Sequence, residues 1–210
     1  QGGVNRPALT HADIEVHVRL AKWARDRHFG IEIDSYGNQF MRRAGTIPDA
    51  LAIVSGSHSD TQPTGGRFDG ISGILSAVEA LEVIDDAGIA TRHPLEIVIW
   101  NNEEGVRFNP TNMGSAVYTG ASAVDVMLAA TDREGNTMGG AVRNLRDAIP
   151  WAKVRNLKTP LAAFVELHIE QGPVLEIENL DIGIVTAIQG TRKFEVEIIG
   201  DEAHAGTTPE

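Results

Sequence analysis

The stretch Leu51–Gly73, which reads LAIVSGSHSDTQPTGGRFDGISG, decides the fold that the sequence predicts. It begins with a short apolar run, Leu51–Val54, and continues into a glycine-rich loop that contains His58, Asp60 and Asp69. Apolar residues then return at positions 71, 74, 75 and 78, which is the spacing of a helix. We therefore predict a buried strand, a polar loop at its carboxyl end, and a helix. Open α/β sheets bind their ligands at this edge.

Two further apolar runs end in polar residues of the same kind. Leu95–Trp100 (LEIVIW) leads into Glu103 and Glu104, and Leu161–Leu167 (LAAFVEL), a third buried strand, ends at His168. A strand, a helix and a second strand in this order form a right-handed crossover, so the two strands are parallel and their loops leave the sheet at one edge. We predict an α/β fold with a mostly parallel mixed sheet flanked by helices.

The remaining pattern predicts elements around this sheet. A helix begins near Thr10, where Asp13 suggests a capped start, and runs to about residue 27. A hairpin turns at residues 36–38, and residues 121–130 and 142–149 are expected to be helical. Alternating apolar residues predict antiparallel-type strands at Ile182–Ile188 and Phe194–Ile199. Three histidines on or near the first helix do not share one face, and we interpret them as solvated: His11, His17 and His28.

Composition excludes several classes of partner. The formal charge of −11 argues against nucleic acid or an anionic membrane, because phosphate binding depends on basic patches. No apolar stretch approaches the roughly 18–20 residues that span a bilayer. The chain contains no cysteine, which excludes disulfides and thiolate sites and fits a reducing compartment, so we expect a cytoplasmic protein.

Each polar residue at a strand end also has an ordinary structural explanation. A single histidine after a strand is more often a hydrogen-bonded structural residue, and paired glutamates in a loop are usually solvated. The glycines at 65, 66, 70 and 73 form a tight turn that opens a helix, and their spacing matches neither G-x-G-x-x-G nor a P-loop. No G-x-S-x-G sequence suggests a serine hydrolase. The joint placement at one sheet edge favours a functional site.

Imidazole and carboxylate donors without a thiol suit Zn²⁺, Mn²⁺, Co²⁺ or Ni²⁺, and their number suggests a hydrolytic site with two divalent metal ions. His58 would bind one ion and His168 the other. Asp69 can offer one oxygen to each, which two cations about 3.5–4 Å apart require. The Asp60 carboxylate would accept the second N–H of the His58 ring and fix its tautomer.

The adjacent Glu103 and Glu104 can divide two roles. One of them would bind a metal ion. The other would take a proton from the attacking water and give it to the leaving nitrogen, which is general base and acid catalysis.

Six motifs resemble the M20-type metalloamidohydrolases, and in particular the branch with N-carbamoyl-L-amino-acid hydrolase, allantoate amidohydrolase and yeast-type β-ureidopropionase. They occur in the order of the family and cover essentially the whole chain: GGVNRPALT (2–10), GSHSDT (56–61), GGRFDG (65–70), NNEEGVRF (101–108), ELHIEQGP (166–173) and AHAGTTP (203–209). The HIEQGP sequence favours this branch over the M20 dipeptidases.

The resemblance implies a role for each matching residue. The implied metal ligands, with the aspartate bridging the ions, are His58, Asp69, Glu104 and His168. Glu103 would be the general base and acid, Gln171 would contact substrate, and His204 would bind substrate and stabilise the tetrahedral intermediate in a neighbouring subunit. The implied activity is hydrolysis of a linear amide or ureido C–N bond in a small carboxylate substrate, an N-carbamoyl-L-amino acid or allantoate.

The resemblance also implies domains that this sequence does not contain. Family members are roughly twice as long, with an inserted lid and dimerisation domain and a later histidine as fifth metal ligand. We therefore expect residues 1–205 to be an incomplete metal-binding catalytic domain of zinc-peptidase type, and residues 206–210 to begin the lid. The full-length protein would be a homodimer, and this piece alone would be inactive. The alternatives are an M20-type dipeptidase or aminoacylase, and an inactive metal-binding fragment.

Overall fold

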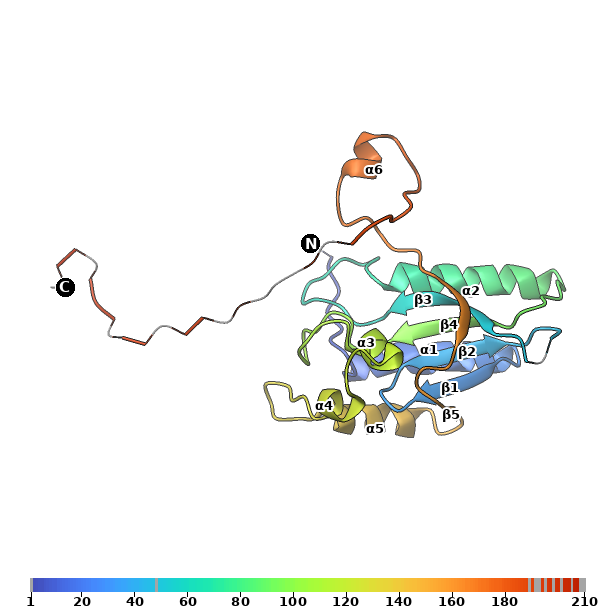
Figure 1. Cartoon of the computed structure of the whole chain (residues 1–210), viewed down its shortest axis with the longest axis horizontal. Coiled ribbons are helices and arrows are strands. Elements are labelled where there is room, and N and C mark those ends of the chain that lie inside the picture. The colour runs from blue at the N-terminus through green and yellow to red at the C-terminus, as the bar shows by residue number, and fades with distance from the viewer. Residues whose placement is uncertain are drawn as a thin grey trace. The chain divides into compact units, whose positions relative to one another are not determined.

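The computed structural model describes residues 2–47, 49–188, 190, 194, 196–197, 199–200, 202–204 and 206–207. The chain divides into two compact units, Gln1–Ile169 and Glu170–Glu210. The first unit contains the sheet and most of the helices, as Figure 1 shows. In the described part of the second unit, the only regular element is the short helix α6, Val174–Ile177.

One six-stranded sheet forms the centre of the first unit. Its order is β5-β1-β2-β4-β3-β6. The pairs that β2 forms with β1 and β4 are antiparallel, and the other pairs are parallel, so the predicted mostly parallel mixed sheet is confirmed. The strands are β1 Gly30–Asp34, β2 Gln39–Arg43, β3 Ala52–His58, β4 Leu95–Trp100, β5 Lys153–Arg155 and β6 Leu161–Val165.

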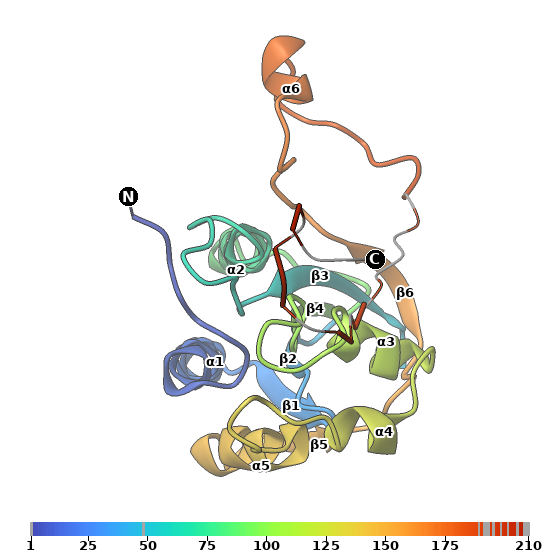
Figure 2. The same ribbon diagram turned by 90° about the vertical axis from the view of Figure 1, so that its left-hand side faces the viewer.

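Helices cover the sheet from both sides. Figure 2 shows α1 and α2 on one side and α3 on the other. The central strand β4 is buried on both faces: Ile97 and Ile99 belong to one apolar cluster, and Val98 and Trp100 belong to a second cluster with Tyr118 of α3. The helices of the first unit are α1 His11–Asp26, α2 Ile71–Asp86, α3 Met113–Thr119, α4 Val124–Leu128 and α5 Met138–Ala148. None of the helices in the described part of the chain has the length and hydrophobicity that a membrane crossing requires.

The elements around the quoted stretch are confirmed. β3 and β4 are parallel and α2 connects them, so the carboxyl ends of both strands lie at the same edge of the sheet. β1 and β2 form the predicted hairpin, with Ile31 opposite Met41. The three-residue strand β5 was not predicted, because it is too short to show a period.

The prediction of a third buried strand is wrong about burial. β6 lies at the end of the sheet order and pairs with β3 alone, and the exposed fractions of Phe164 and Val165 are 41% and 61%. The strand predicted at Ile182–Ile188 is also wrong, since these residues form no regular structure and Ile188 is 95% exposed. An apolar alternation becomes a strand only beside a partner strand, and sequence alone does not supply one. The strand predicted at Phe194–Ile199 lies partly outside the described residues.

The interpretation of His17 as a solvated residue is wrong, whereas His11 and His28 are exposed as predicted. The buried stripe of α1 begins at Asp13 and His17 and continues to Ala24, so two polar residues occupy its first turns. The His17 ring contacts the Gln39 side chain, whose oxygen lies 3.1 Å from Nδ1. A buried polar group with a partner avoids the desolvation cost that favours exposure.

The start of α1 differs in detail from the expected cap. Thr10 is the N-cap residue, but its hydroxyl donates to the carbonyl of Pro7 at 2.8 Å, and the Asp13 carboxylate instead accepts the N–H of Leu9. Helix α5 has the side-chain cap that α1 lacks, because Oγ1 of Thr137 accepts the N–H of Gly140 at 3.1 Å.

We expect Thr137→Ala to lower the free energy of unfolding by about 1 kcal/mol, because it leaves an N–H of the first helical turn without its side-chain acceptor. Urea unfolding measures this value. Thr137→Ser is the matched control, since its hydroxyl can accept the same hydrogen bond and stability should stay close to that of the original chain. Equal loss in both variants would contradict the assignment of the cap.

Candidate metal centre

His58 is the last residue of β3 and is 2% exposed. Its Nδ1 lies 2.8 Å from the main-chain carbonyl of Asp60, and a carbonyl only accepts, so Nδ1 carries the hydrogen. The prediction that the carboxylate of Asp60 accepts this N–H is wrong in its acceptor, because the main-chain carbonyl of the same residue accepts it. Nε2, the other ring nitrogen, faces Asp69 and Glu103, whose nearest oxygens are 3.8 and 3.5 Å away.

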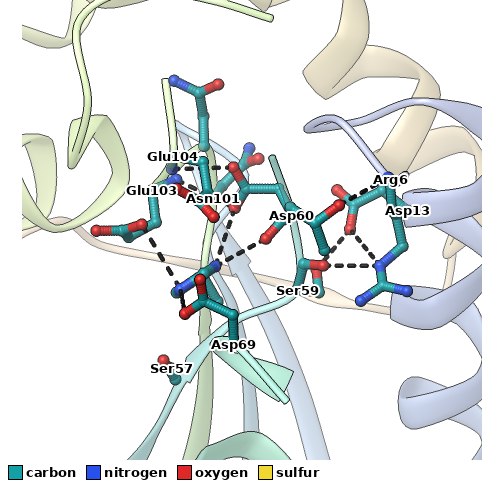
Figure 3. Close-up of polar contacts among 12 residues, drawn as sticks. Arg6, Asp13, Ser57, Ser59, Asp60, Asp69, Asn101, Glu103 and Glu104 are labelled. Carbon is teal, nitrogen blue, oxygen red and sulfur yellow. Dashed lines mark hydrogen bonds and ion pairs between the residues drawn. The ribbon is translucent and has the colours of Figure 1, made fainter. Parts of the chain in front are cut away.

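The Asp60 carboxylate instead holds the loop after β4. Its two oxygens accept the main-chain N–H groups of Glu103 and Glu104, each at 3.1 Å (Figure 3). Burial, followed by the nearby charge of Asp13, raises the pKa of Asp60 to about 7. This carboxylate therefore fixes the main chain of both glutamates, which leaves their side chains available for chemistry.

The two glutamates have different surroundings. The Glu103 carboxylate faces His58, and burial raises the pKa of its carboxyl; the charge of His58 lowers it again, whereas the charge of Glu104 adds to the rise. The Glu104 carboxylate accepts hydrogen bonds from the side chain of Gln62 at 2.8 Å and from its main-chain N–H at 3.3 Å. Gln62 was missed by the sequence analysis, because a glutamine in a polar loop gives no distinct signal.

Asp69 lies between the two histidines of the centre. Its Oδ1 is 3.3 Å from Nε2 of His168 and 3.8 Å from Nε2 of His58, and the two rings are stacked with their centroids 5.9 Å apart. Burial lowers the pKa of His58, but the charges of Asp60 and Glu103 outweigh that effect and raise it. A carboxylate between two imidazoles is an arrangement that suits a bridging ligand.

Gly70 permits this approach of the loop to His58. Its φ is +66°, and a Cβ atom there would lie 2.5 Å from Cε1 and Nε2 of the His58 ring. Only glycine combines the left-handed backbone with the absence of a side chain, which explains the glycine that directly follows Asp69.

Within the described residues, the ligand atoms gather in two overlapping groups whose members lie within 4.8 Å of one another. The groups are His58 with Asp69 and His168, and His58 with Glu103 and Glu104. Imidazole nitrogens and carboxylate oxygens at this spacing fit a borderline divalent cation such as Zn²⁺ or Mn²⁺. Gln171 and His204 belong to the second unit, and their roles stay predictions.

A cavity of about 400 Å³ adjoins the centre. His58, Glu103 and His168 form one part of its lining. The rest is divided between aromatic or apolar side chains (Trp100, Tyr118, Leu161, Phe164) and polar ones (Asn112, Ser115, Thr119, Glu166). The centre is therefore open to a small molecule.

Comparison with known proteins identifies the family. The sequence model of Peptidase family M20/M25/M40 matches residues 54–209. The N-carbamoyl-L-amino-acid amidohydrolase of Rhizobium meliloti is 42% identical over 99% of this chain and 49% of its own length. The allantoate deiminase of Arabidopsis thaliana is 34% identical over 98% of this chain and 40% of its own length.

A solved structure agrees with these relatives. The amidase of the hydantoinase/carbamoylase family from Burkholderia multivorans superposes with a TM-score of 0.80 and 45% identity, over 85% of this chain and 43% of that one. The chain spans about half the length of the curated relatives it matches. The resemblance drawn from the motifs is confirmed, and the chain belongs to Peptidase family M20/M25/M40.

Proposed function

We propose that the protein hydrolyses a linear amide or ureido C–N bond in a small carboxylate-bearing substrate. The observation that carries the proposal is the convergence of His58, Asp69, Glu103, Glu104 and His168 at one edge of the sheet. The names of the relatives support an N-carbamoyl-L-amino acid or allantoate as substrate. Hydrolysis of the former would give the amino acid, carbon dioxide and ammonia.

We further propose that His58, Asp69, Glu104 and His168 hold two divalent metal ions, with Asp69 shared between them. The donor types and their spacing support this assignment. When bound, such ions supply Lewis-acid activation of water and of the scissile carbonyl.

In this proposal Glu103 moves the proton. Its carboxylate takes a proton from the attacking water and delivers it to the leaving nitrogen as the C–N bond breaks, so no net proton is gained or lost by the protein. Burial raises the pKa of Glu103, which brings the carboxyl closer to the pH at which it must both accept and donate. Because Nδ1–H of His58 is hydrogen-bonded to the main-chain carbonyl of Asp60, Nε2 is the ring nitrogen that would bind a metal ion.

The remaining expectations are proposals of the same kind. Gln171 and His204 would contact substrate, the latter across a homodimer, and residues 206–210 would begin a lid that follows the catalytic domain at 1–205. Absence of cysteine fits a cytoplasmic location.

The test is an assay of the full-length protein with N-carbamoyl-L-amino acids and with allantoate in the presence of Mn²⁺, with ammonia release as the measurement. Turnover of either substrate is the expected result. Activity on dipeptides alone would replace the proposal with an M20-type peptidase, and no activity on any of the three would favour a metal-binding protein without catalysis.

A further inference from the structure

Two serines flank His58 in the chain, and their hydroxyls bond to carboxylates from two different segments. Figure 3 shows the bond between Ser59 and Asp13. Oγ of Ser57 donates to Oε1 of Glu166 at 2.5 Å, and Oγ of Ser59 donates to Oδ1 of Asp13 at 2.6 Å. Both serines are buried, at 0% and 1% exposure. Hydrogen bonds to an ionised acceptor are about twice as strong as neutral ones, so each serine fixes a distant segment against β3.

The bond from Ser59 joins the loop after His58 to helix α1. Asp13 is itself held, because its second oxygen accepts the N–H of Leu9 at 2.8 Å. Nε of Arg6 donates to the main-chain carbonyl of Ser59 at 2.7 Å, so residue 59 is fixed through its side chain and its main chain. The next residue is Asp60, whose carboxylate binds the N–H groups of the two glutamates. A shift of Ser59 would therefore displace both glutamates.

The hydrogen bond from Ser57 holds the segment that follows β6, which leads from Glu166 to His168. Glu166 is the first residue beyond the strand and stands two positions before His168. The same segment passes close to α2, because a Cβ atom at Gly73 would collide with the main-chain oxygen of Leu167. Ser57 and Gly73 thus fix the path of the chain from which His168 reaches Asp69.

We propose that Ser57 and Ser59 are positioning residues that act on different parts of the centre. Ser57 holds His168 beside Asp69, and Ser59 holds the carboxylate that orients the two glutamates. This inference rests on the proposed metal centre. Loss of a residue that orients a metal ligand typically lowers metal affinity about 10–100-fold, which makes the inference measurable without turnover.

The experiment titrates the metal-free protein with Co²⁺ and follows the visible absorption of the bound ion. We expect Ser57→Ala and Ser59→Ala each to weaken Co²⁺ binding about tenfold. Ser72→Ala is the matched control, because the Ser72 hydroxyl is buried and makes no hydrogen bond within the described part of the chain. Its affinity should equal that of the original protein. Circular dichroism verifies that each variant is folded.

A double-mutant cycle assigns each serine to its part of the centre. In a His168→Ala background, Ser57→Ala should have no further effect on Co²⁺ affinity, whereas Ser59→Ala should retain its tenfold effect. Glu166→Gln keeps an oxygen that can accept the Ser57 hydrogen bond and should bind Co²⁺ nearly as well as the original protein. If a serine variant does not fold, Glu166→Ala replaces Ser57→Ala and Asp13→Ala replaces Ser59→Ala, with the same expected losses, because each removes the accepting carboxylate.

The results of these titrations distinguish failure of the positioning role of Ser57 and Ser59 from failure of the proposed metal centre. Absence of Co²⁺ binding to the original protein overturns the proposed metal centre. Binding by the original protein and equal binding by both serine variants overturns the positioning role alone. Equal coupling of both serines to His168 overturns their assignment to different parts of the centre.

Discussion

Glu103→Gln lowers the turnover number of the full-length protein by about 10²–10⁴-fold and leaves its metal content unchanged, if Glu103 transfers the proton. The amide has nearly the shape of the carboxylate but cannot accept a proton from water. Its main-chain N–H still donates to Asp60, so the loop keeps its position. Steady-state kinetics and elemental analysis of the same preparation measure the two effects.

Glu104→Gln is the matched control for this prediction. The change is the same, at the next residue, whose main-chain N–H is held by the same carboxylate. We expect this variant to lose metal, because an amide is a poorer ligand than a carboxylate for these ions. Loss of metal from Glu103→Gln and not from Glu104→Gln would show that the two glutamates have exchanged roles.

Gly70→Ala should lower the free energy of unfolding by about 2–4 kcal/mol. About 1–2 kcal/mol comes from the left-handed backbone, and the rest comes from the steric conflict with the His58 ring. The new Cβ atom would lie 2.5 Å from the ring, so His58 must move and Co²⁺ affinity should fall as well. Urea unfolding of the metal-free protein measures the change in the free energy of unfolding independently of the change in Co²⁺ affinity.

Gly66→Ala provides the comparison within the same loop. A Cβ atom there meets nothing closer than the Cβ of Asp69 at 3.9 Å, which is an ordinary contact, and the backbone is outside the left-handed region. Its stability should stay within about 0.5 kcal/mol of the original protein, as for most surface changes. Similar losses in Gly66→Ala and Gly70→Ala would contradict the explanation by close approach.

The sequence was sufficient for the parts of the fold that depend on local pattern. Leu95–Trp100 was predicted with its observed bounds, because a short, mainly apolar segment rich in β-branched residues (Ile97–Ile99) is typical of a strand buried on both faces. The exposure of β6 could not be predicted in the same way, since apolar residues look alike in a central and in a terminal strand. The burial of His17 depends on Gln39, which is 22 residues away in the chain.

The candidate ligands were predicted because they follow strand ends, and parallel strands bring their ends to one edge. The groups that hold those ligands were not predicted. Ser57 and Glu166 are 109 residues apart, and Ser59 and Asp13 are 46 residues apart, so no local motif joins them. Serine and aspartate are also common on surfaces, and only burial distinguishes Ser57, Ser59 and Asp13 from the rest. Glu166 is exposed, and only its contact with Ser57 distinguishes it.

The Asp60 carboxylate accepts the main-chain N–H groups of two consecutive residues, Glu103 and Glu104, and this makes the loop suitable for redesign. The position of the loop is encoded in backbone bonds, and the identity of the side chains at 103 and 104 contributes nothing to those bonds. An engineer could therefore exchange both side chains to recruit another cation or another reaction while the scaffold beneath them stays in place. Asp60 itself is the position that such a design must leave unchanged.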